Sequence, residues 1–410
     1  MAPHADETNE NGTNGTKGTN KANGTSGVHG TSDVHSTSPI PGLWITGIAS
    51  QYPPYLLGPE KLNEFTWRFF DVEEPGLKKL LQTNKTSGIE TRASIGDYQS
   101  GIADLDTFYR RAGVDLAAQA CRKAMREWGG RPSDITHTVA VTRTDQGNPG
   151  YDLLVARRLG LPHTVDRTLL HGVGCAGGLA IMRAAVQIAS GATARSKPAR
   201  VLVFACELCT PNVRHDLAEA EACADPADVS IAGVLLADGA AAFVLCNDLG
   251  LELPPAEPLF QLLECGNQTL PNTLQHMGFY AESTGFRTVL TRDVPSFTKM
   301  AIEPMFSQLL PSFWEKVGLD DLSVAAFDWA LHRGGEAIIH GAQAMLHLTN
   351  EQLRATREIY RTRGNSSSPT VLAVLDLLQK MGRGKDHIVA TSFGPGLAIE
   401  MSLFRRCRDE

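Results

Sequence analysis

The chain passes from a strand into a helix at residues 171–178, whose sequence is His-Gly-Val-Gly-Cys-Ala-Gly-Gly. RTLLH (167–171) before the turn predicts a strand, and LAIMRAAVQIAS (179–190) after it predicts a helix. The small residues permit a tight turn that sets Cys175 at the N-terminus of the helix, where the helix dipole and free amide groups lower the pKa of a thiol. Cys175 is therefore a candidate nucleophile, although a buried structural cysteine fits the same turn.

Strands and helices alternate on both sides of this turn. Apolar runs predict strands at 43–50, 136–142, 201–207, 239–246, 260–266, 325–332, 387–393 and 397–404. Helices are predicted at 104–127, 150–159, 295–317, 335–346, 351–360 and 368–381. Such alternation predicts a layered α/β fold with a largely parallel sheet.

The sequence divides into a polar tail and two similar halves. Residues 1–39 are mostly Asn, Gly, Thr and Ser. They cannot bury enough apolar surface to offset their ordering entropy, so we expect a disordered low-complexity tail that is dispensable for chemistry. The strand–helix rhythm of 40–250 repeats in 251–410, which suggests an internal duplication with the loop-like segment 248–258 at the boundary.

The composition is that of a soluble globular protein, with 42% hydrophobic and 20% charged residues in a chain of 410. A net charge of −7 gives no broad electrostatic reason to bind nucleic acid. The first residues lack the apolar core of a secretory signal, and no apolar run approaches the roughly 20 residues that span a bilayer. We therefore expect a cytoplasmic protein without stable membrane insertion.

The eight cysteines are expected to be free thiols in such a protein. Cys206 and Cys209 form a single CxxC pair, which cannot supply the four ligands of a structural zinc site. The pair also ends a predicted strand, whereas redox CxxC motifs open a helix. We expect no metal site.

Two further motifs place polar side chains at the ends of predicted elements. Trp329-Ala-Leu-His-Arg-Gly-Gly335 sets His332 at the end of a strand, near the carboxyl edge of a sheet, where the active sites of α/β proteins gather. Gly364-Asn-Ser-Ser-Ser368 sets Asn365 just before a helix. Taken singly, each has a structural explanation, as a hydrogen-bonded core histidine and as a helix N-cap.

Four segments taken together carry a family resemblance: GVGCAGG (172–178), WALHRGG (329–335), GNSSSPTVLAVLD (364–376) and SFGPGLAIE (392–400). Their order and spacing resemble the signatures of type III polyketide synthases, the chalcone synthase-like family, over about residues 40–405. The GVGC-x-GGL form and the leading tail are similar to fungal members. The resemblance implies the thiolase fold, a duplicated αβαβα layered sandwich, in a homodimer.

The resemblance also implies a reaction, the work of an acyltransferase. Cys175 takes an acyl group from a coenzyme A thioester, and His332 as an imidazolium stabilises the thiolate. Malonyl-CoA then loses carbon dioxide, while N–H groups of His332 and Asn365 stabilise the resulting enolate. Repeated condensation builds a poly-β-keto chain that cyclises. Acyl-CoA and malonyl-CoA are substrates, and no metal or redox cofactor is expected.

Further positions match residues around the family's tunnel. Lys78 and Lys85 match basic positions that contact the phosphates of coenzyme A. Asn148 aligns with a plant methionine that crosses the dimer interface. Other plant pocket and gatekeeper positions are taken here by Cys209, Asn212, Leu236 and Thr288.

Small side chains at the gatekeeper positions Leu236 and Thr288 predict a cavity open to a medium- or long-chain fatty acyl starter, because apolar burial contributes about 0.8 kcal/mol per methylene. The expected products are alkylresorcinols, alkylresorcylic acids or alkyl-α-pyrones. Arg333 stands where plant members have a proline, and its bulk and charge could alter the local loop.

Two alternatives stay open at this point. A β-ketoacyl synthase III would use the same three residue types for one condensation with acyl carrier protein; the GNSSS and SFGPG segments favour the polyketide synthase. A catalytically silent dimeric scaffold that binds acyl-CoA is the second alternative. A hydroxymethylglutaryl-CoA synthase would need a glutamate general base, and no matching motif stands out.

Overall fold

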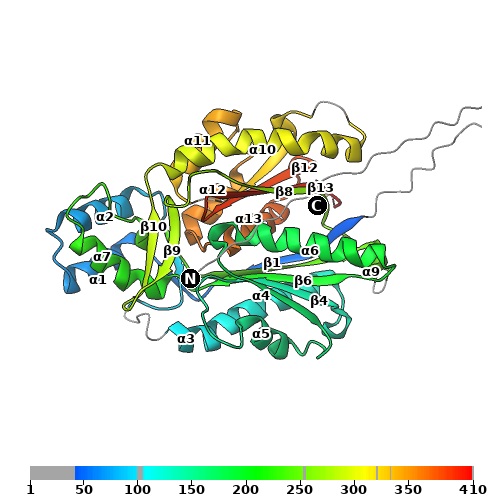
Figure 1. Cartoon of the computed structure of the whole chain (residues 1–410), viewed down its shortest axis with the longest axis horizontal. Helices are drawn as coiled ribbons and strands as arrows, with labels where there is room; N and C mark the ends of the chain where they lie inside the picture. The colour runs from blue at the N-terminus through cyan, green and yellow to red at the C-terminus, as the bar shows by residue number, and fades with distance from the viewer. Residues whose placement is uncertain (1–41, 99–104, 253–254, 320–321, 333, 409–410) are drawn as a thin grey trace, which may run out of the picture. The chain divides into compact units, whose positions relative to one another are not determined.

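A nine-stranded mixed sheet runs through the chain in the order β11-β12-β13-β8-β1-β7-β6-β4-β5 (Figure 1). The computed structural model describes residues 42–98, 105–252, 255–319, 322–332 and 334–408. The predicted tail, 1–39, and Arg333 lie outside the described residues. The strands of the sheet are β1 (Leu43–Gln51), β4 (His137–Val141), β5 (Asp166–Leu170), β6 (Arg200–Glu207), β7 (Gly239–Asn247), β8 (Phe260–Thr269), β11 (Phe327–Leu331), β12 (His387–Gly394) and β13 (Ala398–Arg406).

The described helices are α1 (Pro59–Phe69), α2 (Pro75–Thr86), α3 (Leu105–Phe108), α4 (Val114–Trp128), α5 (Tyr151–Leu159), α6 (Gly177–Ala194), α7 (Val213–Ala222), α8 (Ala232–Leu235), α9 (Asp248–Leu251), α10 (Val294–Val317), α11 (Glu336–Leu346), α12 (Arg354–Arg363) and α13 (Pro369–Lys380). The predicted helices lie close to their expected positions, although the one predicted at 104–127 is divided into α3, a π-helical turn at Tyr109–Gly113 and α4. α1, α2, α7, α8 and α9 were not predicted from the sequence. Two small antiparallel sheets stand apart, β2 (Tyr55–Leu57) with β3 (Arg92–Ser94), and β9 (Met277–Ala281) with β10 (Phe286–Leu290).

Two parts of the sheet share one topology. In the first, β1-β7-β6-β4 are neighbours in that order, and in the second β8-β13-β12-β11 are. In each part the first two pairs are antiparallel and the last pair is parallel. An antiparallel contact between β1 and β8 joins the parts. Duplication of one half would produce this pattern, while the boundary between residues 250 and 251 stays a prediction.

The prediction of a largely parallel sheet is wrong, because most neighbouring strands in the described sheet are antiparallel. Strands become parallel when a helix crosses over between neighbours, as between β4 and β5. The last strand of each half runs antiparallel to the strand before it: β7 does so after the segment that holds α7 and α8, and β13 does so after a short turn. β12 and β13 are joined by the short turn at Pro395-Gly396, where Gly396 has a φ of 107°, so β13 must run back along β12.

The elements stack in five layers, helix, sheet, helix, sheet, helix (Figure 1). α6 and α13 form the middle layer and pack on each other and on strands of both halves. α4 covers the outer face of β1 and β7, and α10 covers the outer face of β8 and β13. This is the αβαβα sandwich expected from the sequence. The segment Gly174–Ala194, which contains α6, is long and apolar enough to span a membrane, but its place between the two parts of the sheet explains that composition.

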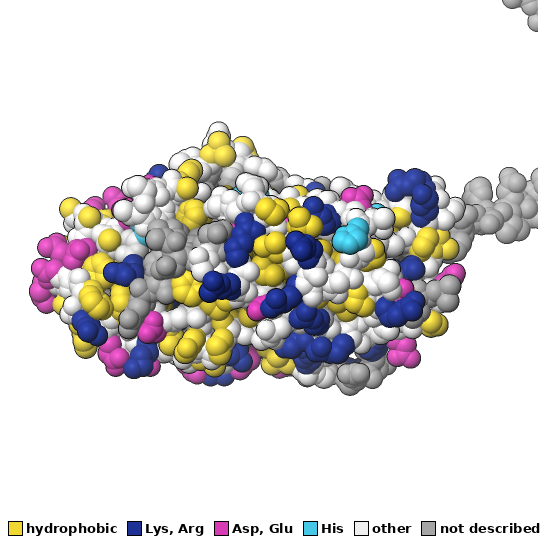
Figure 2. All heavy atoms as spheres, turned by 90° about the horizontal axis from the view of Figure 1, so that it is seen from below, with side chains coloured by type: hydrophobic (Ala, Val, Ile, Leu, Met, Phe, Trp, Pro, Cys, Tyr) yellow, Lys and Arg dark blue, Asp and Glu magenta, His cyan; other side chains and the backbone are white. Residues whose placement is uncertain are grey.

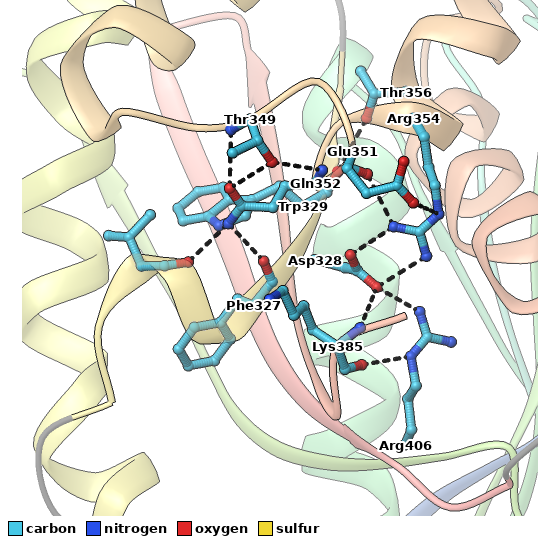
Figure 3. Close-up of polar contacts among 11 residues, drawn as sticks. Phe327, Asp328, Trp329, Thr349, Glu351, Gln352, Arg354, Thr356, Lys385 and Arg406 are labelled. Atoms are coloured by element: carbon cyan, nitrogen blue, oxygen red, sulfur yellow. Dashed lines mark hydrogen bonds and ion pairs between the residues drawn. The ribbon is translucent and has the colours of Figure 1, made fainter. Parts of the chain in front are cut away.

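A buried polar network fixes β11, the strand that leads to His332 (Figure 3). Asp328 is 1% exposed and pairs with Arg354 at 2.7 Å and with Arg406 at 2.9 Å. The side-chain amide of Gln352 donates to the carbonyl oxygen of Phe327 at 2.9 Å. Such a paired and hydrogen-bonded buried carboxylate holds one geometry, and it ties the start of β11 to the loop before α12 and to β13.

Candidate active site

Cys175 lies in a single turn of 3₁₀ helix, Gly174–Ala176, directly before α6. Gly174 has a φ of 50°, and a Cβ there would lie 2.7 Å from Cδ of Pro395. At Gly178, a Cβ would lie 2.5 Å from the carbonyl oxygen of Ser368. Gly174 therefore allows close packing against Pro395, and Gly178 allows close packing against the start of α13. The strand, turn and helix predicted around Cys175 are present.

Ser367 contacts Cys175, and Arg143, from a distant part of the chain, bonds to Ser367. Oγ of Ser367 lies 3.3 Å from Sγ of Cys175. Nε of Arg143 donates to the same Ser367 oxygen at 3.1 Å. Burial raises the pKa of the Cys175 thiol, and the charge of Arg143 and the hydrogen bond with Ser367 oppose that rise. The sequence reasoning missed Arg143, although a charged residue directly after the apolar strand THTVAVT was a usable signal.

His332 follows β11 directly, where its backbone N–H donates to the carbonyl oxygen of Thr391 at 2.7 Å. Its side chain is buried, and neither ring nitrogen has a hydrogen-bond partner among the described residues. Burial lowers the pKa of His332 to about 4, which makes the ring neutral at pH 7. A neutral imidazole keeps one N–H donor.

Asn365 is held in one orientation by both its backbone and its side chain. Its Oδ1 accepts from the backbone N–H of Ser367 at 2.8 Å and from Oγ1 of Thr370 at 3.3 Å. Its backbone bonds to Leu235 and Ala237 and sets Asn365 beside Leu236. Because Oδ1 is engaged, the side-chain N–H₂ is the group left to meet a substrate. The helix N-cap is Ser368, so Asn365 does not cap α13.

The three predicted catalytic side chains come together in the wall of one cavity of about 60 Å³. The predicted gatekeepers Leu236 and Thr288 line it as well, as does Arg143. The rest of the wall is mostly apolar and includes Ala232, Leu235, Met277, Phe279, Val289, Leu290, Ile338, Phe393 and Pro395. Residues 277–290, which form the β9–β10 hairpin, were not assigned a structure from sequence, yet they supply much of this wall.

A second, larger cavity of about 1130 Å³ adjoins the first and is open to the surface of the chain. The two share wall residues that mark a path to Cys175: Leu235, Thr288, Val289, Leu290, Gly334 and Ile338. The wall of the larger cavity carries the basic side chains Lys79, Arg287 and Arg292, and also the acidic residues Asp216, Glu219, Asp228, Asp293 and Glu336. The larger cavity thus leads from the surface toward the wall that holds Cys175.

The remaining predicted pocket residues lie in different places. Cys209 and Asn212 line a small adjoining cavity together with Leu236. The side chain of Asn212 bonds to both the N–H and the carbonyl of Phe286, each at 2.8 Å, so it clamps β10 in place. Asn148 is exposed and lines none of these cavities within the described chain.

The two predicted lysines of α2 do not line the larger cavity. Lys78 pairs with Glu73 at 2.7 Å on the exposed side of the helix, and Lys85 is also exposed. Lys79, Thr83 and Thr86 face the cavity instead. The role of Lys78 and Lys85 toward coenzyme A thus stays a prediction, and Lys79 is the lysine of α2 that lines the larger cavity.

The fold and the site correspond to a known family. Residues 97–249 match the N-terminal domain of chalcone and stilbene synthases, and residues 261–407 match the C-terminal domain of the same family. The chain belongs to this family, the type III polyketide synthases, which are acyltransferases. It is 61% identical to the type III polyketide synthase pspB of Penicillium soppii over 90% of this chain and 97% of the relative.

Solved structures agree with this assignment. A type III pentaketide synthase from Neurospora crassa is 37% identical, covers 89% of this chain and 99% of its own, and superposes with a TM-score of 0.84. The acylalkylpyrone synthase csyB of Aspergillus oryzae is 33% identical over 88% of this chain and 94% of the relative. A structure of CsyB with CoA-SH superposes with a TM-score of 0.83 and covers 89% of this chain and 100% of its own.

Proposed function

We propose that this chain loads an acyl-CoA starter on Cys175 and extends it by repeated decarboxylative condensation with malonyl-CoA. The observation that carries the proposal is the meeting of Cys175, His332 and Asn365, which come from three separate segments, in one buried cavity wall. A nucleophile with two nearby N–H donors is the set of groups that thioester condensation needs.

The steps follow from the chemistry of these groups. The Cys175 thiolate attacks the starter thioester, and coenzyme A leaves as its thiolate. Malonyl-CoA then loses carbon dioxide, and the electron pair of the broken bond forms an enolate whose oxygen His332 and Asn365 stabilise. The enolate carbon attacks the carbonyl carbon of the Cys175 thioester, and the carbon–sulfur bond breaks to release the Cys175 thiolate. The lengthened acyl-CoA can load again, and the finished chain cyclises.

An aliphatic starter of medium or long chain fits the walls of the route. The side chains around Cys175 are nearly all apolar, and burial of each methylene against them contributes about 0.8 kcal/mol. The inner cavity of about 60 Å³ is too small for such a chain. The chain must therefore extend along the path past Leu235, Val289 and Ile338 or displace side chains of the wall. The products proposed are alkylresorcinols, alkylresorcylic acids or alkyl-α-pyrones.

The phosphates of coenzyme A require cations near the mouth of the larger cavity. Lys79, Arg287 and Arg292 lie in its wall, and we propose them beside the earlier candidates Lys78 and Lys85. Arg287 already pairs with Glu282 at 2.7 Å, which leaves Lys79 and Arg292 as the stronger candidates.

A homodimer is supported by the exposed edge of the sheet. β5 is the last strand, and it pairs with β4 alone among the described strands, so its other edge keeps backbone groups unpaired. Leu169 on this strand is 37% exposed. Gly150, two residues after Asn148, lies against Leu169, so the Asn148 turn is next to this edge. Figure 2 views the underside of Figure 1, where Lys and Arg side chains gather beside hydrophobic ones. A second copy that pairs through β5 covers the edge.

Product analysis tests the proposed function. Purified protein is incubated with malonyl-CoA and acyl-CoAs of graded length, beside the Cys175→Ala variant, and products are identified by mass spectrometry. Pyrones or resorcinols built from several malonyl units, absent in the variant, are expected. A single β-ketoacyl product made only with carrier protein would move the chain to the synthase III alternative. Product that persists in Cys175→Ala, or none under either condition, would contradict the proposal. A clear preference for a phenylpropanoid-CoA would refute the aliphatic starter.

A further inference from the structure

Arg143 is a buried cation in the wall of the cavity that holds Cys175. Its side chain follows β4, is 6% exposed, and its guanidinium carbon lies 3.9 Å from the ring centroid of Phe279. Nη2 donates to Sγ of Cys209 at 3.2 Å, and Nη1 has no hydrogen-bond partner among the described residues. A guanidinium stays protonated at every pH at which proteins fold, so this site carries a fixed positive charge.

Two successive hydrogen bonds connect that charge with the nucleophile. Nε of Arg143 donates to Oγ of Ser367 at 3.1 Å, and the same oxygen lies 3.3 Å from Sγ of Cys175. Because the Ser367 oxygen already accepts from Arg143, its own hydroxyl hydrogen is available to donate to the sulfur. A hydroxyl that accepts from a cation is polarised and becomes a stronger donor, and a thiolate is a better acceptor than a thiol.

Both ends of this connection are fixed to one buried carboxylate. The backbone N–H of Arg143 donates to Glu207 at 3.1 Å, and Oγ of Ser368, next to Ser367, donates to Oε1 of Glu207 at 2.6 Å. Thr144 adds a further bond to Glu207 at 2.7 Å. The guanidinium and the serine thus keep their positions before any substrate arrives, which is what preorganised stabilisation of a charge requires.

We propose that Arg143 is a positioning residue for the nucleophile, and that its guanidinium acts through the hydroxyl of Ser367 to stabilise the thiolate of Cys175 in the free enzyme. The inference rests on the proposed function in one respect, that Cys175 is the nucleophile. From the sequence, a His332 imidazolium is expected to stabilise the Cys175 thiolate, whereas this inference assigns that positive charge to Arg143.

The other titratable groups around the thiol support this assignment. Glu207, from β6, adds to the rise in the pKa of Cys175 that burial causes, and so acts against the thiolate. His332, from the end of β11, is neutral because burial lowers its pKa to about 4.

Two further titratable groups lie near Arg143. Asp216, from α7, is one of them, and burial raises its pKa to about 7. Cys209 stays a thiol, because burial raises its pKa well above the ordinary value. Against burial and Glu207, the charge of Arg143 lowers the pKa of Cys175.

The pH dependence of Cys175 alkylation measures the effect directly. The protein is treated with iodoacetamide without substrates, and the labelled Cys175 peptide is quantified by mass spectrometry against pH. We expect Arg143→Met to raise the midpoint by about one pH unit, which is about a tenfold slower alkylation below the midpoint. Arg143→Lys keeps the charge and shifts the midpoint less. Ser367→Ala also raises it, and Arg143→Met adds little in the Ser367→Ala background.

Arg92→Met is the matched control. Arg92 is as deeply buried as Arg143, and its guanidinium carbon lies 5.4 Å from the ring centroid of Tyr98. It donates to Tyr98 and to the carbonyl oxygens of Gly233 and Leu236, and none of these groups bonds to Ser367 or Cys175. Its loss is expected to lower Tm but to leave the Cys175 midpoint unchanged.

Three results would overturn the inference. They are an unchanged midpoint in a folded Arg143→Met, an unchanged midpoint in Ser367→Ala, and an equal shift in Arg92→Met. If Arg143→Met does not fold, Ser367→Ala still decides, since the loss of the hydroxyl that connects Arg143 with Cys175 must raise the midpoint. Alkylation needs no turnover, so an unchanged midpoint alongside Cys175-dependent products refutes only this inference. Products that do not depend on Cys175 refute the proposed function itself.

Discussion

At the scale of single residues, burial and local hydrogen bonds set the charge state and the free hydrogen-bond donors of the candidate catalytic groups. The imidazole of His332 is buried without a partner among the described side chains, and burial lowers its pKa, so the ring is neutral. A neutral imidazole has one N–H, which can donate to an enolate oxygen. Asn365 has its oxygen committed to Ser367 and Thr370, which directs its amide hydrogens elsewhere. The environment thus prepares both side chains as neutral donors.

The lowered pKa of His332 predicts how stability depends on pH. The pKa falls from its ordinary value of 6.5 to about 4 on folding, so between these values the unfolded chain binds more protons at this site. The contribution of His332 to the free energy of unfolding therefore decreases as pH falls from 6.5 to 4. We expect His332→Gln to lose less Tm between pH 7 and pH 5 than the wild type does.

Thermal denaturation across that pH range measures the difference. The exposed residue His163 serves as the control, and His163→Gln should follow the wild type. A His332→Gln profile parallel to the wild-type profile would mean that His332 is not buried as a neutral ring.

Loss of the Asn365 donor predicts a slow decarboxylation. Asn365→Asp keeps the oxygen that accepts from Ser367 but removes the side-chain N–H₂. We expect release of carbon dioxide from malonyl-CoA to fall by about two to three orders of magnitude, the usual cost of one lost oxyanion donor. Ser366→Ala, at the adjacent buried hydroxyl, is the control and should retain most activity. A rate within a few fold of the wild type in Asn365→Asp would remove Asn365 from this role.

At the scale of elements, the sequence predicted the strands and helices that build the sheet layers, because their apolar patterns are strong. It did not predict the β9–β10 hairpin, whose short strands are only partly buried and carry no clear alternation. It predicted Cys175, His332 and Asn365 because each lies in a motif. Arg143 lies in none, and its partners Ser367 and Cys209 are far along the chain, so only the folded structure brings them together.

The close packing of α6 on α13 predicts that a larger side chain at Gly178 lowers the stability of the protein. A Cβ at Gly178 would lie 2.5 Å from the Ser368 carbonyl and 2.7 Å from Cγ1 of Val371, so Gly178→Ala must push the two helices apart. We expect a loss of about 1–3 kcal/mol in the free energy of unfolding, measured by urea denaturation.

Gly191 offers a control on the same helix. A Cβ there meets only the end of the Arg195 side chain at 3.6 Å, so Gly191→Ala should be neutral or stabilising, because alanine favours a helix interior over glycine. An equal loss in the free energy of unfolding for both substitutions would show that Gly178 is not required for close packing at the start of α6.

At the scale of the whole molecule, the exposed edge of β5 predicts assembly. The proposed homodimer pairs this strand with a second copy, so Leu169→Lys, on β5, should convert a dimer into a monomer in light scattering after size exclusion. Leu274→Lys changes a leucine that is 75% exposed and belongs to the loop between β8 and β9, and should leave the dimer intact. A Leu169→Lys protein that remains dimeric would place the interface elsewhere.

The most direct test of the account is the mass of the protein after exposure to a medium-chain acyl-CoA without malonyl-CoA. The account predicts that one acyl group is added per chain, that peptide mapping places it on Cys175, that malonyl-CoA removes it, and that Cys175→Ala does not acquire it. An acyl group found on another residue, or one that still forms in Cys175→Ala, would contradict the claim that Cys175 carries the growing chain.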